Sequence, residues 1–125
     1  MTLTPRKATP VGKPAVARRF VFLLLDKFTL LAFASAIEPL RVANRMVGYT
    51  AYTWRLAGET GIEAQSSNGA AFKLDMGLGE IDREDTLFVC GGMDVQKSTT
   101  RPILNWLRRE ARRGIMIGGI CTGSY

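Results

Sequence analysis

The chain has 125 residues, of which 46% are hydrophobic and 22% charged, which is typical of one globular domain. Its formal net charge of +6 arises mostly from residues 1–19, because from Phe20 onward twelve Lys and Arg face eleven Asp and Glu. This distribution argues against a uniformly basic nucleic-acid-binding fold. Two cysteines without any histidine argue against a disulfide framework and a structural zinc site.

Residues 1–18 are predicted to be a flexible basic tail, since they are rich in Pro, Thr and Ala and lack apolar periodicity. A solubilising role is favoured over weak, salt-sensitive attraction to DNA or acidic surfaces. The apolar run Phe20–Leu25 is too short for a membrane span and is followed by Asp26-Lys27, so we expect no membrane association. We expect both cysteines to be reduced thiols, as is usual in a cytoplasmic protein.

The first half of the chain predicts a strand, a helix and a second strand. Arg19–Leu25 is a continuous apolar run, as expected for a strand buried on both faces. Thr29 can cap a helix from about Leu30 to Met46, in which Pro39 removes one backbone hydrogen bond. The apolar positions of this helix are Leu31, Ala34, Ile37, Leu40 and Val42. Tyr52–Ala57 alternates and is rich in strand-forming residues.

The second half predicts a small hairpin and a second strand–helix–strand unit. Ile62–Ala64 and Ala71–Leu74 flank an Asn-Gly turn, and residues 77–84 form a loop or a short helix. Asp85–Cys90 is a strand that ends in Gly91-Gly92. A helix begins at Arg101-Pro102, continues to Arg113 and ends at Gly114. A last strand, Ile115–Ile120, leads into Cys121.

Four arginines lie near the end of the second long helix. This cluster is formed by Arg108, Arg109, Arg112 and Arg113. It has the composition of a nucleic-acid-binding helix, but cations that offset the helix macrodipole on a solvated face are the favoured interpretation.

The alternating order of strands and helices indicates an α/β fold, with a flavodoxin-like parallel sheet and helices on both faces in three layers. Ligands of such sheets bind at the carboxyl edge of the strands. Three loops are predicted to meet there, namely Asp26–Thr29, Cys90–Asp94 and Cys121–Gly123.

Cys121 is the first candidate for chemistry, because a buried strand followed by Cys-Thr-Gly is typical of a strand-to-helix elbow that exposes one side chain. Backbone N–H groups at such an elbow stabilise a thiolate. The chain has no histidine, so a Cys–His pair within it is excluded.

The diglycine and one acid are further candidates. Gly91 and Gly92 could bring backbone N–H groups to a ligand or form part of an oxyanion hole, although a tight turn explains them equally well. Cys90 is interpreted as a small buried hydrophobic residue. Glu38 either binds a polar ligand or backbone N–H, or pairs with Arg41 or Arg45 at helical spacing.

Five stretches carry a family resemblance: RFVFLLLDKFTLLAFASAIEPLRVANR, TWRL, SSNG, DTLFVCGG and GGICTGSY. Through them, residues 19–125 resemble the N-terminal domain of GlxA-type, AraC-family transcriptional regulators. That domain is PfpI-like and belongs to the class I glutamine amidotransferase-like superfamily.

The resemblance implies a sensor with no catalytic residues and no cofactor or metal. In the enzymatic relatives an acid early in the first helix hydrogen-bonds the elbow cysteine, and this position is Ala32 here. Cys121 is then a vestigial nucleophile. The ligand-binding positions that the resemblance implies are Glu38, Gly91, Gly92, Cys121 and Thr122. The implied ligand is an amino-acid-like or quaternary ammonium metabolite, and the implied assembly is a homodimer.

Family members continue beyond the elbow into further strands and a DNA-binding helix-turn-helix domain. The resemblance therefore implies that residues 19–125 are a partial domain, incomplete at its C-terminus. It also implies that DNA is contacted only through a domain absent from this chain. Two other hypotheses remain. One is a cysteine-dependent hydrolase or glyoxalase-like enzyme that uses Cys121 with Gly91-Gly92. The other is a fragment without independent function, whose uncovered apolar surface promotes oligomerisation.

Overall fold

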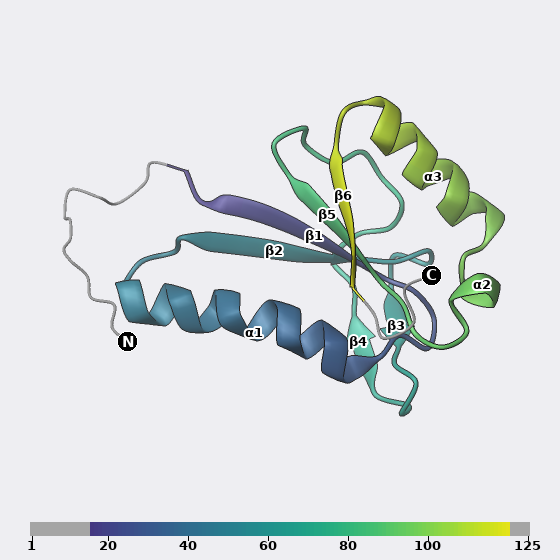
Figure 1. Ribbon diagram of the computed structural model, residues 1–125, viewed down its shortest axis with the longest axis horizontal. Helices are drawn as coiled ribbons and strands as arrows, with labels where there is room; N and C mark the ends of the chain where they lie inside the picture. Colours follow the sequence, from purple (N-terminus) through teal and green to yellow (C-terminus); the bar gives the residue numbers. More distant parts are fainter. Residues whose placement is uncertain (1–15, 121–125) are drawn as a thin grey trace.

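The computed structural model describes residues 16–120, and Figure 1 shows their arrangement. Residues 1–15 of the predicted tail and the predicted elbow residues Cys121 and Thr122 lie outside this range. The elements in chain order are β1 (Arg18–Leu24), α1 (Leu30–Val47), β2 (Tyr52–Ala57), β3 (Glu63–Gln65), β4 (Ala71–Lys73), β5 (Thr86–Cys90), α2 (Val95–Ser98), α3 (Arg101–Arg112) and β6 (Met116–Ile120).

Four of the strands form one parallel sheet in the order β2-β1-β5-β6. The predicted flavodoxin-like α/β fold is therefore confirmed, with α1 on one face and α3 on the other (Figure 1). The predicted hairpin is also present, as the separate antiparallel pair β3–β4, and Gly69 in its turn has a positive φ of 93°.

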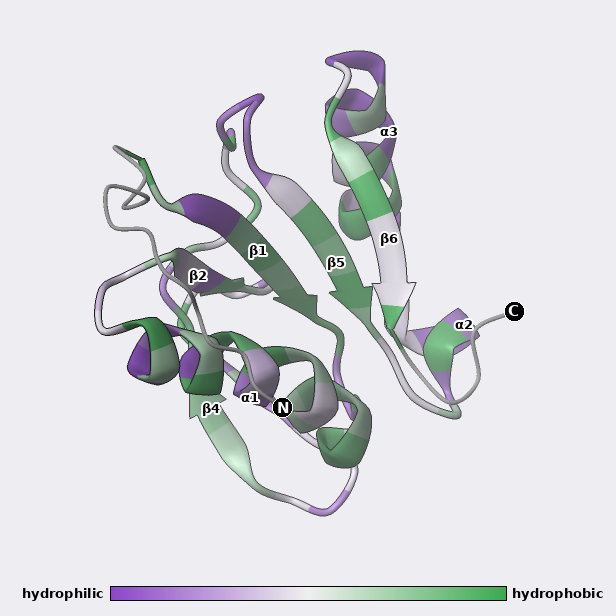
Figure 2. Cartoon of the chain, turned by 60° about the vertical axis from the view of Figure 1, so that its left-hand side comes forward, coloured by the Kyte–Doolittle hydropathy of each residue, from purple (hydrophilic) through white to green (hydrophobic). Residues whose placement is uncertain are grey.

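The central strand β1 supplies side chains to both faces of the sheet. Val21 and Leu23 pack in the core beneath α3, whereas Phe22 and Leu24 pack in the core beneath α1. All four are nearly inaccessible to solvent. Burial on both faces explains why this strand is a continuous apolar run, and Figure 2 shows the hydrophobic character of β1 and of its neighbour β5.

Helix α1 has the predicted span but a different inner face. Phe33 is its buried residue, and the ring of Phe33 packs edge-on against Phe22 and Phe28 at centroid distances of 5.6 and 5.7 Å. Leu31 and Val42, which were predicted on the apolar face, are 75% and 41% exposed. Leu31 lies about 200° around the helix from Phe33, so the two cannot both face the sheet.

The ends of α1 also differ in detail from the prediction. Thr29 is at the N-cap, but its side chain makes no capping hydrogen bond. Gly48 ends the helix in the left-handed conformation with φ 80°. No helix within residues 16–120 has both the length and the apolar character needed to cross a membrane.

Helix α3 holds the long loop before β5 against the sheet. The Trp106 indole N–H donates to the carbonyl oxygen of Gly79 at 2.8 Å, and Arg113 donates to that of Ile81 at 2.9 Å. Glu110, also on α3, is completely buried and forms ion pairs with Arg109 and Arg113. Residues 77–84 are therefore a fastened loop, and the short helix α2 was not predicted from the sequence.

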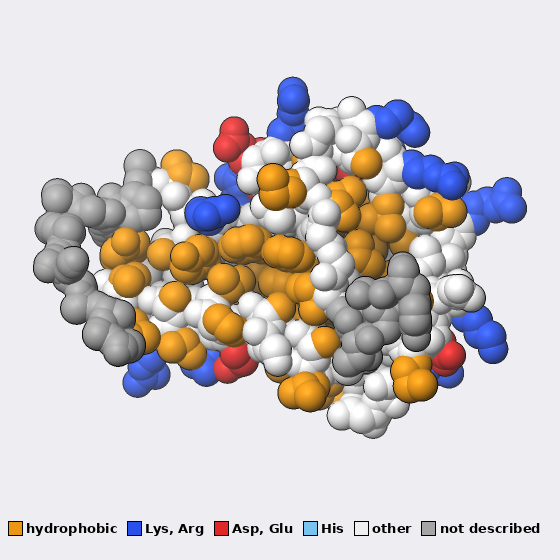
Figure 3. Space-filling model, in the orientation of Figure 1, with side chains coloured by type: hydrophobic (Ala, Val, Ile, Leu, Met, Phe, Trp, Pro, Cys, Tyr) orange, Lys and Arg blue, Asp and Glu red, His pale blue; other side chains and the backbone are white. Residues whose placement is uncertain are grey.

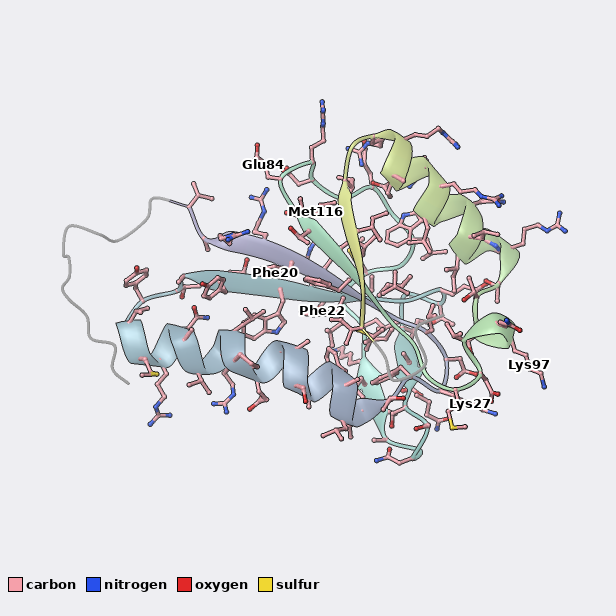
Figure 4. All side chains as sticks on the ribbon, viewed as in Figure 1. Phe20, Phe22, Lys27, Glu84, Lys97 and Met116 are labelled. Atoms are coloured by element: carbon pink, nitrogen blue, oxygen red, sulfur yellow. The ribbon has the colours of Figure 1, made fainter. Side chains whose placement is uncertain are left out.

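The sheet face beneath α1 is covered unevenly. Phe20 and Phe88 are only half-buried, and Met116 at the start of β6 is 70% exposed. Figure 3 shows a band of hydrophobic side chains on this side, and Figure 4 labels Phe20 and Met116 on the same side of the molecule. Within residues 16–120, this part of the face is therefore only partly covered.

Replacing Phe22 tests the core beneath α1. We expect Phe22→Ala to lower the free energy of unfolding by about 3–5 kcal/mol, because it removes a buried ring that contacts Phe33 and Phe88. The control Met116→Ala should change it by only about 0.5 kcal/mol, since that side chain is mostly exposed. Urea denaturation measures both, and equal losses would contradict this packing.

Candidate functional site

The carboxyl edge of the sheet is held together by backbone hydrogen bonds between three strand ends. These bonds run from the N–H of Leu25 to Cys90 O at 3.0 Å, from Thr29 to Gly91 O at 3.1 Å, and from Gly91 to Ile120 O at 3.2 Å. Two of the three predicted site loops therefore meet at this edge. The third begins at Cys121, which is bonded to Ile120 but lies outside the described residues.

Gly91 and Gly92 are both buried, and neighbouring parts of the chain approach them too closely for larger side chains. A Cβ at Gly92 would lie 2.5 Å from the backbone oxygen of Lys27, and one at Gly91 would lie 3.0 Å from a methyl group of Val95. The Gly91 N–H donates to Ile120 O, so it is not available to an oxyanion. The Gly92 N–H has no hydrogen-bond acceptor within residues 16–120.

Lys27 adopts an uncommon backbone conformation beside the diglycine. Its φ is 61°, the one positive value among the non-glycine residues that the structure describes. The Lys27 N–H donates to Gln65 O at 2.8 Å, and the Ser98 hydroxyl donates to the carbonyl oxygen of Asp26 at 2.8 Å. The loop between β1 and α1 is thus fixed from both sides, by the hairpin and by α2.

A hollow of about 530 Å³ adjoins this loop. Its charged side chains are Asp26, Lys27, Glu59, Glu63, Asp94 and Lys97. Figure 4 shows Lys27 and Lys97 at the same end of the molecule. Sequence reasoning missed the hollow, although the turn-forming residues Gly58–Gly61 after β2 were a signal that another loop reaches this edge.

Glu38 lies apart from the diglycine edge, on the exposed side of α1. The Arg41 guanidinium donates to its carboxylate at 2.6 Å, and both side chains are about half exposed. This hydrogen bond lowers the pKa of Glu38 and raises that of Arg41. Of the two interpretations of Glu38, the structure shows the ion pair, and the predicted ligand-binding role gains no support from its surroundings.

No carboxylate is present in the first turn of α1, where Ala32 is half-buried. Cys90 is 1% exposed, in agreement with its interpretation as a core residue. Within residues 16–120, acidic and cysteine side chains are nowhere grouped in threes as a metal ion would require. The diglycine turn itself therefore offers backbone groups, and the charged side chains of the described residues at this edge line the neighbouring hollow.

The other buried acid, Asp85, is at the amino end of the sheet. It accepts a hydrogen bond from Arg19 at 2.7 Å and lies 3.6 Å from Arg55. The hydrogen bond to Asp85 raises the pKa of Arg19. The carboxylate of Asp85 is thus used in joining β1, β2 and the start of β5.

The model of the DJ-1/PfpI family matches residues 18–125 of the chain. The transcriptional regulator GbdR of Pseudomonas aeruginosa is 41% identical over 83% of this chain, and GlxA of Rhizobium meliloti is 37% identical over 86%. An AraC family regulator from Pseudomonas putida has a similar structure, with a TM-score of 0.70, 24% identity, and coverage of 82% of this chain and 63% of the other. The chain spans 28% of the length of GbdR and 34% of that of GlxA.

Substitution of Gly92 tests the close approach at the edge. We expect Gly92→Ala to destabilise the protein by about 1–3 kcal/mol, because its Cβ would overlap a backbone oxygen that cannot move aside cheaply. Gly119→Ala is the matched control, since a Cβ there meets no atom within 4 Å. Thermal denaturation compares the two, and a Gly92 variant as stable as the control would contradict the geometry.

Proposed function

Because this chain belongs to the DJ-1/PfpI family, we propose that it is the ligand-sensing and dimerising part of an AraC-family transcriptional regulator. The curated relatives that it matches are transcriptional regulators. The observation that carries the sensing role is the first turn of α1, which lacks the carboxylate that partners the elbow cysteine in the enzymatic relatives.

The proposed ligand site lies at the diglycine edge and comprises Gly91, Gly92, Cys121 and Thr122. Its support is the hydrogen bond from Gly91 to Ile120, which holds the residue before Cys121 against the diglycine turn. An amino-acid-like or quaternary ammonium metabolite is the proposed ligand. Binding of such a metabolite would shift the balance between two arrangements of the regulator.

A cysteine-dependent hydrolase or glyoxalase-like enzyme is the second candidate, favoured by the Gly92 N–H that has no acceptor within residues 16–120. Two observations oppose it. The Gly91 N–H is already used within the sheet, and the first turn of α1 offers no acid. We therefore favour a non-catalytic role.

The proposed homodimer is supported by the outer side of α1. Leu31, Val42 and Met46 are 75%, 41% and 65% exposed. At 100° per residue they fall within about 60° of one another, as one stripe. An isologous dimer uses the same patch on both copies, and this exposed apolar stripe would be covered by its own copy across a twofold axis.

The remaining parts of the proposal concern the whole regulator. DNA would be bound by a helix-turn-helix domain of that regulator, and the regulator would act in the cytoplasm. GbdR and GlxA are HTH-type transcriptional regulators, which supports this assignment.

Alkylation of the cysteines distinguishes the sensor from the enzyme. We expect Cys121 to react with iodoacetamide along a pH curve centred near the free-cysteine value of about 8.5. Mass spectrometry of the digested peptides follows both cysteines, and buried Cys90 serves as the slow internal control. A thiolate formed well below that pH, together with turnover of an aldehyde or amide, would overturn the sensor proposal.

A charge in the α1 stripe tests the dimer. We expect Met46→Glu to weaken self-association at least tenfold, about 1.4 kcal/mol, because the new carboxylate would be desolvated at the interface. Sedimentation velocity over a concentration series measures this change. Ile62→Glu is the control, since Ile62 is 74% exposed and precedes β3, outside α1. An unchanged Met46 variant would show that another surface mediates association.

A further inference from the structure

We propose that the outer face of α3 binds the phosphate backbone of DNA through Arg101, Arg108 and Arg112, here called the arginine stripe. The inference rests on the proposed function, which brings a DNA duplex close to this domain. It concerns a surface on the opposite side of the sheet from α1.

The three arginines form one straight row along the helix. They are seven and four residues apart, so at 100° per residue they lie within about 40° of one another and span about 16 Å. All three are exposed, whereas Ile103 and Trp106 on the opposite side of α3 are buried. Figure 3 shows Lys and Arg side chains projecting along the edge of the molecule that α3 occupies in Figure 1.

The arginine stripe is not neutralised by neighbouring acids. Within residues 16–120 none of its three members takes part in an ion pair, in contrast to Arg109 and Arg113 on the same helix. Two of the acids beside α3 are paired with other arginines: Glu110 is buried with Arg109 and Arg113, and Glu80 pairs with Arg113. A third, Glu59, accepts a hydrogen bond from the Thr100 hydroxyl at 3.0 Å and forms no ion pair within residues 16–120.

The helix macrodipole does not explain the whole row. Arg109 and Arg112 lie in the last turn, where cations are favourable. Arg101 is the first residue of α3, at the end where a cation is unfavourable, and the first turn contains no acid. The interpretation favoured from the sequence therefore accounts for the C-terminal arginines but not for Arg101.

Phosphates of DNA fit the length and the chemistry of the stripe. A duplex carries one negative charge per about 1.7 Å of axis, so about 16 Å of it presents several phosphates. Arginine binds phosphate in a bidentate manner. Because the inner side of α3 is packed on the sheet, the helix cannot lie deep in a DNA groove. We therefore assign the arginine stripe contacts to DNA phosphates alone, which position a protein but read no sequence.

The test compares two triple variants of the chain 1–125 in binding to a fluorescein-labelled duplex of about three helical turns, followed by anisotropy. The first is R101Q/R108Q/R112Q. The control R18Q/R45Q/K73Q removes the same charge from exposed positions on other elements. At about 0.1 M salt we expect the stripe variant to bind at least tenfold more weakly, with a salt slope smaller by about 2–3. The control should lose less than about threefold.

Several outcomes would overturn the proposal. The stripe variant could bind DNA as tightly as the unmodified chain does, or both triple variants could lose the same affinity. Polyglutamate could also compete for the chain as effectively as DNA does at equal charge. If the triple stripe variant shows no thermal unfolding transition, the single variant R108Q replaces it. We expect R108Q to show about a third of the triple variant's change in the logarithm of the DNA affinity. The assay uses no metabolite and no other domain, so its failure would leave the sensing and dimerising proposal standing.

Discussion

The pairing of β1 with two neighbours is the constraint on which the rest of the structure depends. The strand is hydrogen-bonded in parallel to β2 and to β5, and its alternate side chains enter two different cores. Phe22 fixes the position of α1 through Phe33, while Val21 and Leu23 lie beneath α3. Because one strand organises both layers, its end also determines where the loop before α1 meets the diglycine.

That meeting point is closely packed, which limits its chemistry. Gly92 lies against the backbone of Lys27, and Gly91 uses its N–H to hold Ile120. Both glycines are therefore needed for the fold even without any ligand. The edge belongs to a DJ-1/PfpI domain, and the first turn of its helix α1 carries no acid.

The fold could be predicted from the sequence because its signals are local. The apolar run of β1, the Asn-Gly turn and the glycine after each long helix each define an element without knowledge of its neighbours. The inner face of α1 could not be predicted, since Leu31 and Phe33 are both apolar and only the rings on the sheet decide between them. The hollow beside Lys27 depends on loops brought together by tertiary structure, which spacing along the chain does not reveal.

The fastening of the loop before β5 has a mechanical consequence. Trp106 and Arg113 attach that loop to α3, and the loop runs directly into Asp85, which grips Arg19 on the central strand. A displacement of α3 would therefore pull on this loop and, through the contact between Asp85 and Arg19, on the amino end of the central strand.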